Sequence, residues 1–198
     1  MRQHDICHLI ERVTSVLQTH KKGTGRYARW IWEDKQKTRN LAPSEYGCAD
    51  AANILYTVGE FPKNPAEREE WVNTLQNFQN PKTGLFQEPT HHPIHTTAHC
   101  AAALELFDAT CRYPMYDLLQ YTKVNSLYGL LENLDWEQDP WPQSHRGAGI
   151  FAALVLTDAV DQEWQDAYFA WLKQEADPET GLWRKNFVTK GSAPVFHH

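Results

Sequence analysis

The sequence has little of what marks membrane, secreted or nucleic-acid-binding proteins. It contains no run of eighteen apolar residues, and charged side chains interrupt its first seventeen positions, so neither a membrane span nor a signal peptide is indicated. The net charge is -6 and the lysines are scattered, which excludes the basic stripe of a nucleic-acid groove. We therefore expect a cytoplasmic protein without nucleic-acid or membrane partners.

Cysteine is also scarce. Cys7, Cys48, Cys100 and Cys111 form no Cys-x-x-Cys pair, and a chain of 198 residues can bury a core without disulfide bonds. We interpret all four as reduced thiols, in keeping with the same compartment. No segment alternates strictly between apolar and polar residues, so no β-strand is predicted.

Helical periodicity, by contrast, covers most of the chain, because apolar residues recur three and four positions apart. A loop is expected from Trp136 to Ser144, and the stretch from Cys111 to Tyr121 is irregular. The expected helices are Asp5–His20, Arg26–Lys35, a segment from a Ser44 cap to Gly59, Pro65–Phe78, a segment opened by Pro93, Lys123–Leu134, His145–Val160 and Asp161–Ala176.

Two turns and four helix starts recur along the sequence. The segment Pro81–Phe86 (PKTGLF) returns as Pro178–Trp183 (PETGLW), 97 positions later. Helices rich in small residues begin near Tyr46, His95, His145 and Pro194, at intervals of 49, 50 and 49 positions. This period predicts an all-α fold of αα-hairpins about fifty residues long, in one domain over 1–198, with N-terminal helices in 5–36 and repeats from about residue 44.

The arrangement resembles the α/α toroid superfamily, which includes terpenoid cyclases, protein prenyltransferase β subunits and many carbohydrate-active lyases and hydrolases. The segment Gln79–Phe86 is similar to the glutamine-to-tryptophan repeat of squalene cyclases, with Phe in place of Trp, and Gln174–Trp183 matches it more loosely. The resemblance implies an α/α barrel from about Tyr46 to His198. It does not specify an activity, because such folds carry unrelated chemistries.

The predicted ring is incomplete. A closed toroid of five to six hairpins needs on the order of 250 to 350 residues at this period, and the chain ends where a fourth inner helix begins. The sequence therefore represents a fragment, an open ring, or a ring that a partner chain or further copies complete.

The candidate functional residues lie at the starts of the inner helices, where a toroid has one mouth of its cavity. His145 and Arg146 stand before two glycines, and a helix N-terminus with an arginine suits a carboxylate, so an acidic sugar is the expected ligand. The alternative is that the glycines permit close helix packing while Arg146 pairs with an acidic neighbour. With Tyr46, Asp50 and Glu88 these residues form the expected catalytic set; His95, His99, Trp141 and Trp183 are expected to contact substrate.

His91, His95 and His99 follow one another at intervals of four, which places imidazoles on one helix face. Such a pair could bind zinc, with a third ligand from Glu88, Cys48 or His145, but Thr96 replaces the glutamate of the zinc-protease pattern. Cavity-lining or packed histidines without any cofactor are the preferred interpretation.

Asp50 lies in the first turns of its helix, which favours an ionised base, and Glu88 could serve as a protonated acid; either could equally be structural. Trp141 lies outside the repeated turn and is therefore a better sugar contact than Phe86 or Trp183. The leading hypothesis is a carbohydrate-active hydrolase, lyase or epimerase with a small-molecule or oligosaccharide ligand. The alternatives are a terpenoid cyclase or prenyltransferase, whose DxDD, DDxxD and Asp-x-Cys motifs are absent, and a non-catalytic helical-repeat binding domain.

Overall fold

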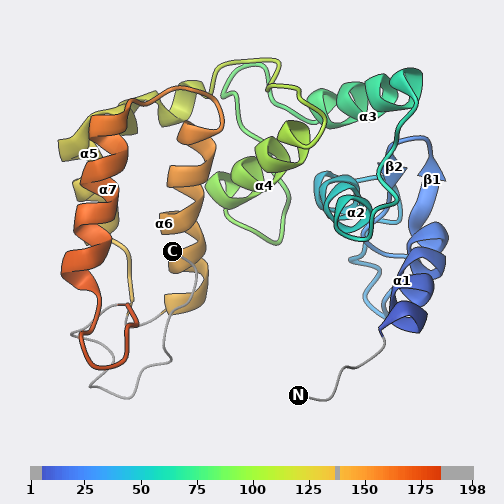
Figure 1. Ribbon diagram of the computed structural model, residues 1–198, viewed down its shortest axis with the longest axis horizontal. Coiled ribbons are helices and arrows are strands. Elements are labelled where there is room, and N and C mark those ends of the chain that lie inside the picture. The colour runs from blue at the N-terminus through green and yellow to red at the C-terminus, as the bar shows by residue number, and fades with distance from the viewer. Residues whose placement is uncertain (1–5, 137–138, 184–198) are drawn as a thin grey trace. The chain divides into compact units, whose positions relative to one another are not determined.

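The computed structural model describes residues 6–136 and 139–183, and the protein is mostly helical (Figure 1). The expectation of an all-α fold is confirmed apart from one two-stranded sheet. None of the helices in the described part is long and apolar enough to cross a membrane.

The chain divides into two compact units: unit 1 runs to Phe78 and includes Ala103–Thr110, and unit 2 comprises Gln79–Ala102 and the chain from Cys111. Asp5, the expected first cap, and the fourth helix start at Pro194 lie outside the described residues.

Unit 1 begins with helix α1 (Cys7–His20) and a hairpin of strands β1 (Lys21–Gly23) and β2 (Arg26–Tyr27). The predicted helix over Arg26–Lys35 is wrong: after β2 the chain forms a long loop. Gly25 turns the hairpin with φ +66°, and a Cβ there would lie 2.8 Å from Trp71 Cα, so the hairpin is held where only glycine fits. A tertiary contact has thus overridden the local helical pattern.

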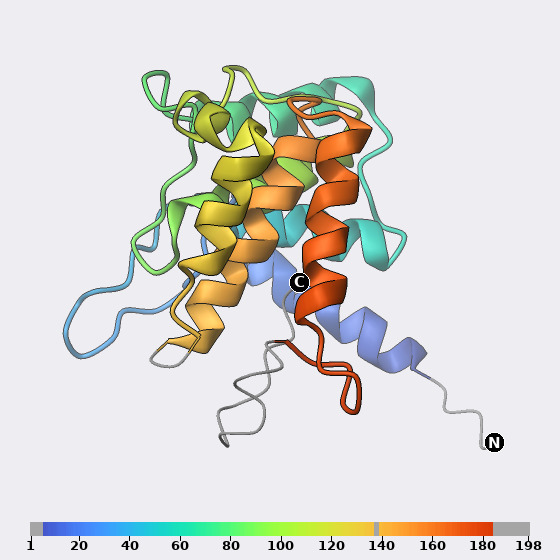
Figure 2. The ribbon, with the colours of Figure 1, turned by 90° about the vertical axis from the view of Figure 1, so that its left-hand side faces the viewer.

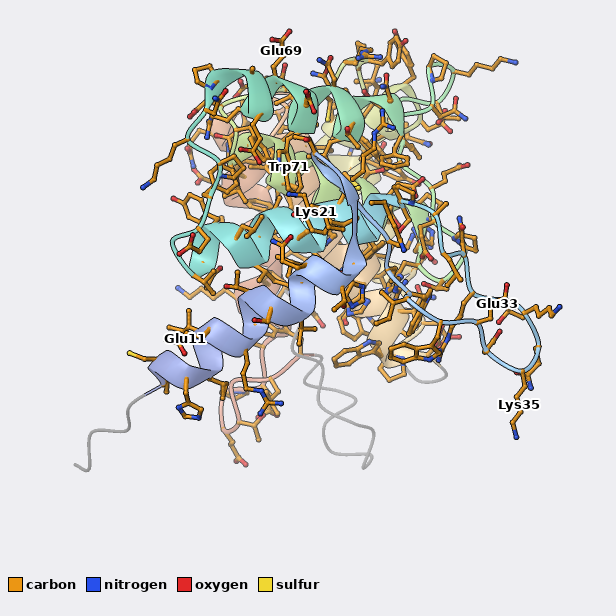
Figure 3. All side chains as sticks on the ribbon, turned by 90° about the vertical axis from the view of Figure 1, so that its right-hand side faces the viewer. Glu11, Lys21, Glu33, Lys35, Glu69 and Trp71 are labelled. Carbon is orange, nitrogen blue, oxygen red and sulfur yellow. The ribbon has the colours of Figure 1, made fainter. Side chains whose placement is uncertain are left out.

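Helices α2 (Glu45–Thr57) and α3 (Pro65–Asn77) complete the main part of unit 1. Ser44 caps α2 as predicted, since its hydroxyl accepts a hydrogen bond from Gly47 N–H, and Pro65 occupies the first turn of α3. Trp71 from α3 is buried and stacks on Tyr27 with ring centroids 5.2 Å apart. Figure 3 shows Trp71 between α3 and α2, and Glu33 and Lys35 on the loop before α2.

Unit 2 contains the main hydrophobic core, formed with helices α5 (Val124–Glu132), α6 (Pro140–Val155) and α7 (Gln162–Glu175). These helices lie side by side in Figure 2. Tyr168 from α7 donates its hydroxyl proton to Gly147 O at 3.0 Å, and Trp171 Nε1–H donates to Glu132 Oε1 at 2.6 Å. Two buried aromatic side chains of α7 therefore connect it to both neighbours while satisfying their own polar atoms.

The remaining elements of unit 2 are helix α4 (Pro93–Glu105), whose last turn belongs to unit 1, and the 3₁₀ segment η1 (Tyr116–Thr122). Pro93 opens α4 as expected. Asp161 caps α7 as expected, because its carboxylate accepts from Trp164 N–H at 3.0 Å. The predicted loop to Ser144 is wrong in its second half, since α6 already begins at Pro140. Prolines are tolerated in a first turn because its N–H groups have no intrahelical acceptor, so they do not mark a loop here.

The two Pro-x-Thr-Gly turns have the same hydrogen-bond pattern. Gly84 N donates to Asn80 O and Gly181 N donates to Asp177 O, each at 2.8 Å, and the two glycines have φ of 74° and 72°. The side-chain oxygen of Asn80 or Asp177 also accepts from the backbone two and three residues on. Each turn is therefore an Asx turn encoded by its own sequence.

Helices α2, α4 and α6 end in a common way. Gly59, Asp108 and Asp158 have positive φ, and the next N–H reaches five residues back to Leu55, Leu104 and Leu154. This is the Schellman motif, which satisfies carbonyls at a helix end. The three closing leucines follow one another at 49 and 50 positions.

Candidate functional site

The candidate site of unit 2 is built on the first turns of α4 and α6. A Cβ added to Gly149 would lie 3.1 Å from His95 Cα and 3.2 Å from His95 N, so the backbones of α4 and α6 approach closely at this point. Gly149 therefore permits helix packing, which was one of the two explanations of the glycines. The same approach brings His145 of α6 against His95 of α4.

We name His91, His95, His99 and His145 the histidine cluster. The rings of His95 and His145 are stacked, with centroids 4.4 Å apart and an interplanar angle of 20°. His91 stacks on His95 at 5.5 Å, and His95 lies parallel to His99 at 6.5 Å. The cluster is partly exposed rather than sealed in the core. Four imidazoles thus lie together, one from the turn before α4, two from α4 and one from α6.

Within the described residues, the histidine cluster does not have the geometry of a zinc site. Stacked rings face one another, whereas metal ligands direct ring nitrogens at a common point with tetrahedral geometry. Among residues 6–136 and 139–183, no group of three His, Cys, Asp or Glu side chains is placed to hold a metal ion. The pair His95 and His99 therefore gains no third ligand from this part of the protein.

Glu88 belongs to a local turn before α4. Its Oε2 accepts from Thr90 N at 2.9 Å and from Thr90 Oγ1 at 2.6 Å, and it lies 3.3 Å from His91 Nδ1. Only 9% of the side chain is exposed. These contacts use the carboxylate as a hydrogen-bond acceptor, which fits a positioning role better than that of a proton donor.

Arg146 follows His145 directly on α6. Its Nε–H is buried and donates no hydrogen bond, and no ion pair joins its guanidinium to a carboxylate of the described residues. The acidic neighbour expected in the structural explanation is thus missing from the described residues. A buried polar atom without a partner costs free energy, so such groups commonly mark a place where a ligand or ion binds.

Two further residues report on the surroundings of Arg146. Partial burial of the His92 ring and the positive charge of Arg146 both lower the pKa of His92. Trp141 is 57% exposed and packs edge-on against His145 with centroids 5.0 Å apart. A cation, an imidazole and an exposed indole therefore lie along α6 within two turns.

Trp183 makes a structural contact within unit 2. Its Nε1–H donates to Leu172 O at 2.6 Å at the end of α7, so it fastens the second Pro-x-Thr-Gly turn. Its counterpart Phe86 is fully buried. Both residues are used for packing, as the recurrence of their position suggests.

Tyr46 and Asp50 belong to unit 1. Tyr46 is 6% exposed, and the Arg29 guanidinium lies over its ring at 5.1 Å. Asp50 is exposed on the next turn of α2. Tyr46 is therefore a packed residue of the α2 start, and Asp50 lines a separate pocket.

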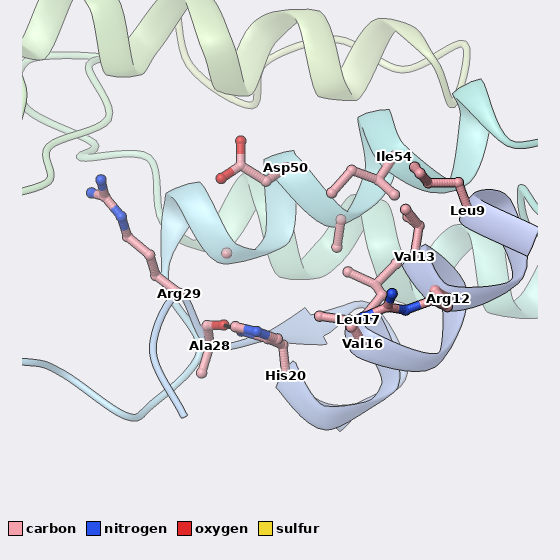
Figure 4. A pocket seen from close by; sticks show the side chains of 12 residues that line it. Leu9, Arg12, Val13, Val16, Leu17, His20, Ala28, Arg29, Asp50 and Ile54 are labelled. Atoms are coloured by element: carbon pink, nitrogen blue, oxygen red, sulfur yellow. Dashed lines mark hydrogen bonds between the residues drawn. The ribbon is translucent and has the colours of Figure 1, made fainter. Parts of the chain in front are cut away.

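The pocket of unit 1 lies between α1 and α2 and was not anticipated from the sequence. It has a volume of about 450 Å³. Figure 4 shows apolar side chains of α1 near Ile54 of α2, with Arg12 among them, and Arg29 and Asp50 also line the pocket. The signal that could have revealed it is the apolar stripe of α1, of which only Leu17 is buried.

Comparison with protein families, with curated protein sequences and with solved structures gives no match to this chain.

Proposed function

We propose that this protein is a carbohydrate-active enzyme of the α/α toroid kind, acting on an acidic sugar at the candidate site of unit 2. The common ends of α2, α4 and α6 and the two equal Pro-x-Thr-Gly turns support a repeat of about fifty residues. In such an architecture the small-residue helices are the inner ones, and the α4 and α6 starts belong to one mouth of the cavity.

The observation that carries the proposal is Arg146, a partly buried cation whose Nε has no hydrogen-bond partner and which pairs with no carboxylate of the described residues, next to the stacked His145. A sugar carboxylate would supply the missing anion in the bidentate geometry that guanidinium groups favour. Trp141 offers an exposed ring face for the sugar. The site thus has the three elements that an acidic sugar requires.

Among the reactions considered, β-elimination has the best support. Neutral His145 takes the proton α to the carboxylate, and Arg146 stabilises the negative charge that develops on the carboxylate oxygens. The electron pair of the broken C–H bond forms the new C=C bond, and the glycosidic oxygen at the β position leaves and takes a proton from water. Hydrolysis would instead need two carboxylates such as Asp50 and Glu88, and Glu88 is committed to its local turn.

The test is to incubate the purified protein with oligogalacturonate and with a neutral oligosaccharide of equal length, and to follow the ultraviolet absorbance of the conjugated double bond. We expect absorbance to rise with the uronate alone, and the rate to fall by about two to four orders of magnitude in His145→Ala. His8→Ala, on exposed α1, is the matched control. No product from any of several uronate linkages, with binding retained, would leave a non-catalytic sugar-binding domain; no binding would remove the proposal.

A further inference from the structure

The pocket between α1 and α2 is independent of the proposed sugar site, because all of its lining residues belong to unit 1. Its wall on α1 is an apolar stripe at helical spacing, Leu9, Val13, Val16 and Leu17, and Ala51 and Ile54 of α2 form the opposite wall. Leu9 and Val16 remain 52% and 56% exposed. A soluble helix rarely leaves such a continuous stripe uncovered without something to bind there.

The size of the pocket suits a small molecule. Its volume of about 450 Å³ lies within the range of roughly 300–1,000 Å³ that ligand sites span. Most of the lining is aliphatic, as is typical of sites that take a hydrocarbon chain. The occupant should therefore be largely apolar and flexible enough to follow a groove between two helices.

The charged side chains define the polar end of the occupant. Two guanidinium groups, Arg12 and Arg29, line the pocket with one carboxylate, Asp50, and Figure 4 shows Arg12 among the apolar side chains of α1. The Arg29 guanidinium lies over the rings of Trp30 and Tyr46, 5.5 and 5.1 Å from their centroids. The lining thus carries a surplus of positive charge, which complements an anion.

We propose that this pocket binds a fatty carboxylate, with the hydrocarbon chain along the α1 stripe and the carboxylate on Arg12. Asp50 in the same lining favours a monoanion over a dianionic phosphate, because a second negative charge would be repelled. The hydrocarbon chain of the ligand binds because its apolar surface is removed from water, so the affinity rises by at most about fourfold for each buried methylene.

The experiment is isothermal titration of the full chain with octanoate, decanoate and dodecanoate below their aggregation concentrations, with 1-decanol and decyl phosphate as further probes. We expect saturable binding at one site, affinity that increases with chain length, and decanoate bound about tenfold more tightly than decanol or than decyl phosphate. Arg12→Gln should reduce decanoate affinity about five- to tenfold and leave decanol unchanged. Arg112→Gln, an exposed arginine of unit 2, should change neither.

A matched pair on α1 tests the place of the chain. Leu9→Asp puts a negative charge into the pocket lining and should abolish decanoate binding, whereas Ile10→Asp, on a neighbouring exposed residue outside the lining, should leave it intact, and Leu9→Asn should weaken decanol and decanoate alike. Equal loss in the two aspartate variants, equal affinity for decanol and decanoate, or no saturable binding would overturn the proposal. Sedimentation would also overturn the proposal if it showed that a second copy of the protein covers α1 and that Leu9→Asp acts only by dissociating this dimer.

Discussion

The starts of helices α2 and α6 occupy equivalent places in the predicted repeat and are used in opposite ways. Counted back from their common ends at Leu55 and Leu154, Tyr46 corresponds to His145 and Gly47 to Arg146. In α2 the tyrosine is packed and the glycine is covered by backbone, since a Cβ there would lie 2.3 Å from Tyr27 O. In α6 the same two positions carry a stacked imidazole and a cation without an acidic partner in the described residues.

The comparison teaches that one helix start is packed into the fold, while the other carries the groups to which we assign the proposed ligand. At α2, the hairpin strand β2 lies where a side chain at position 47 would be. At α6, the equivalent position holds one of the largest side chains in the protein. Substitutions at the paired positions should therefore separate stability from binding.

The largest effect is expected from Tyr46→Ala. The Tyr46 ring is nearly buried and the Arg29 guanidinium packs over it. Its removal should lower the free energy of unfolding by about 3–5 kcal/mol. The paired His145→Ala should cost about 1 kcal/mol or less, because the ring is partly exposed. Chemical denaturation of both variants measures the two values, and equal losses would contradict the division of roles.

Gly47→Ala should follow in size. Its Cβ would meet backbone atoms of residues 27–29 between 2.3 and 2.8 Å away, so strand β2 must move, at a cost of about 1–3 kcal/mol. Arg146→Ala should change the unfolding free energy by less than about 0.5 kcal/mol, since no described partner is lost. If Gly47→Ala keeps both its unfolding free energy and the β1–β2 hairpin unchanged, the close backbone contact at Gly47 does not limit stability.

Arg146→Gln should instead reduce binding. The variant removes the charge while keeping a hydrogen-bonding side chain, so affinity for an oligouronate should fall by about 1.5–3 kcal/mol with little change in stability. Arg29→Gln in α2's surroundings should leave that affinity unchanged but destabilise unit 1, because Arg29 packs on Tyr46. Calorimetric titration and thermal denaturation of the two variants give both numbers.

The smallest effect concerns pH. Because the folded-state pKa of His92 is lowered by partial burial and by Arg146, the unfolded chain takes up the proton more readily than the folded one. The contribution of His92 to stability is therefore complete above the ordinary imidazole pKa of roughly 6.5 and is lost as the pH falls below it. An NMR titration should show that the pKa of His92 is higher in Arg146→Gln than in the unmodified protein. An unchanged pKa would show that the charge of Arg146 does not act on the His92 ring.

The features predicted correctly from the sequence are those encoded locally. Caps at Ser44 and Asp161 and the glycine turns need only a few neighbouring residues to form. The surroundings of the two turns could not be predicted in the same way. A Cβ at Gly84 would lie 1.9 Å from Pro114 O, whereas one at Gly181 would meet nothing within 4 Å. The same local code thus serves one covered and one open turn.

The features that could not be predicted depend on distant contacts. The segment after Arg26 becomes a strand and loop because Trp71 and α2 lie against the hairpin. The stacking of His95 on His145 follows from how α4 meets α6, and the lack of a hydrogen-bond partner for Arg146 Nε within residues 6–136 and 139–183 also depends on distant contacts, which no spacing reveals. Glu88 looked like an acid by position, and its commitment to Thr90 appeared only in the fold.

The most direct measurement is an NMR titration of the tryptophan indole N–H signals with oligogalacturonate. The proposed site predicts a saturable shift of the Trp141 signal, with Trp71 and Trp164 in the buried parts of the two units unchanged. The shift should vanish in Arg146→Gln and with a neutral oligosaccharide of equal length. An unmoved Trp141 signal at saturating uronate, or an identical response to the neutral sugar, would contradict the account.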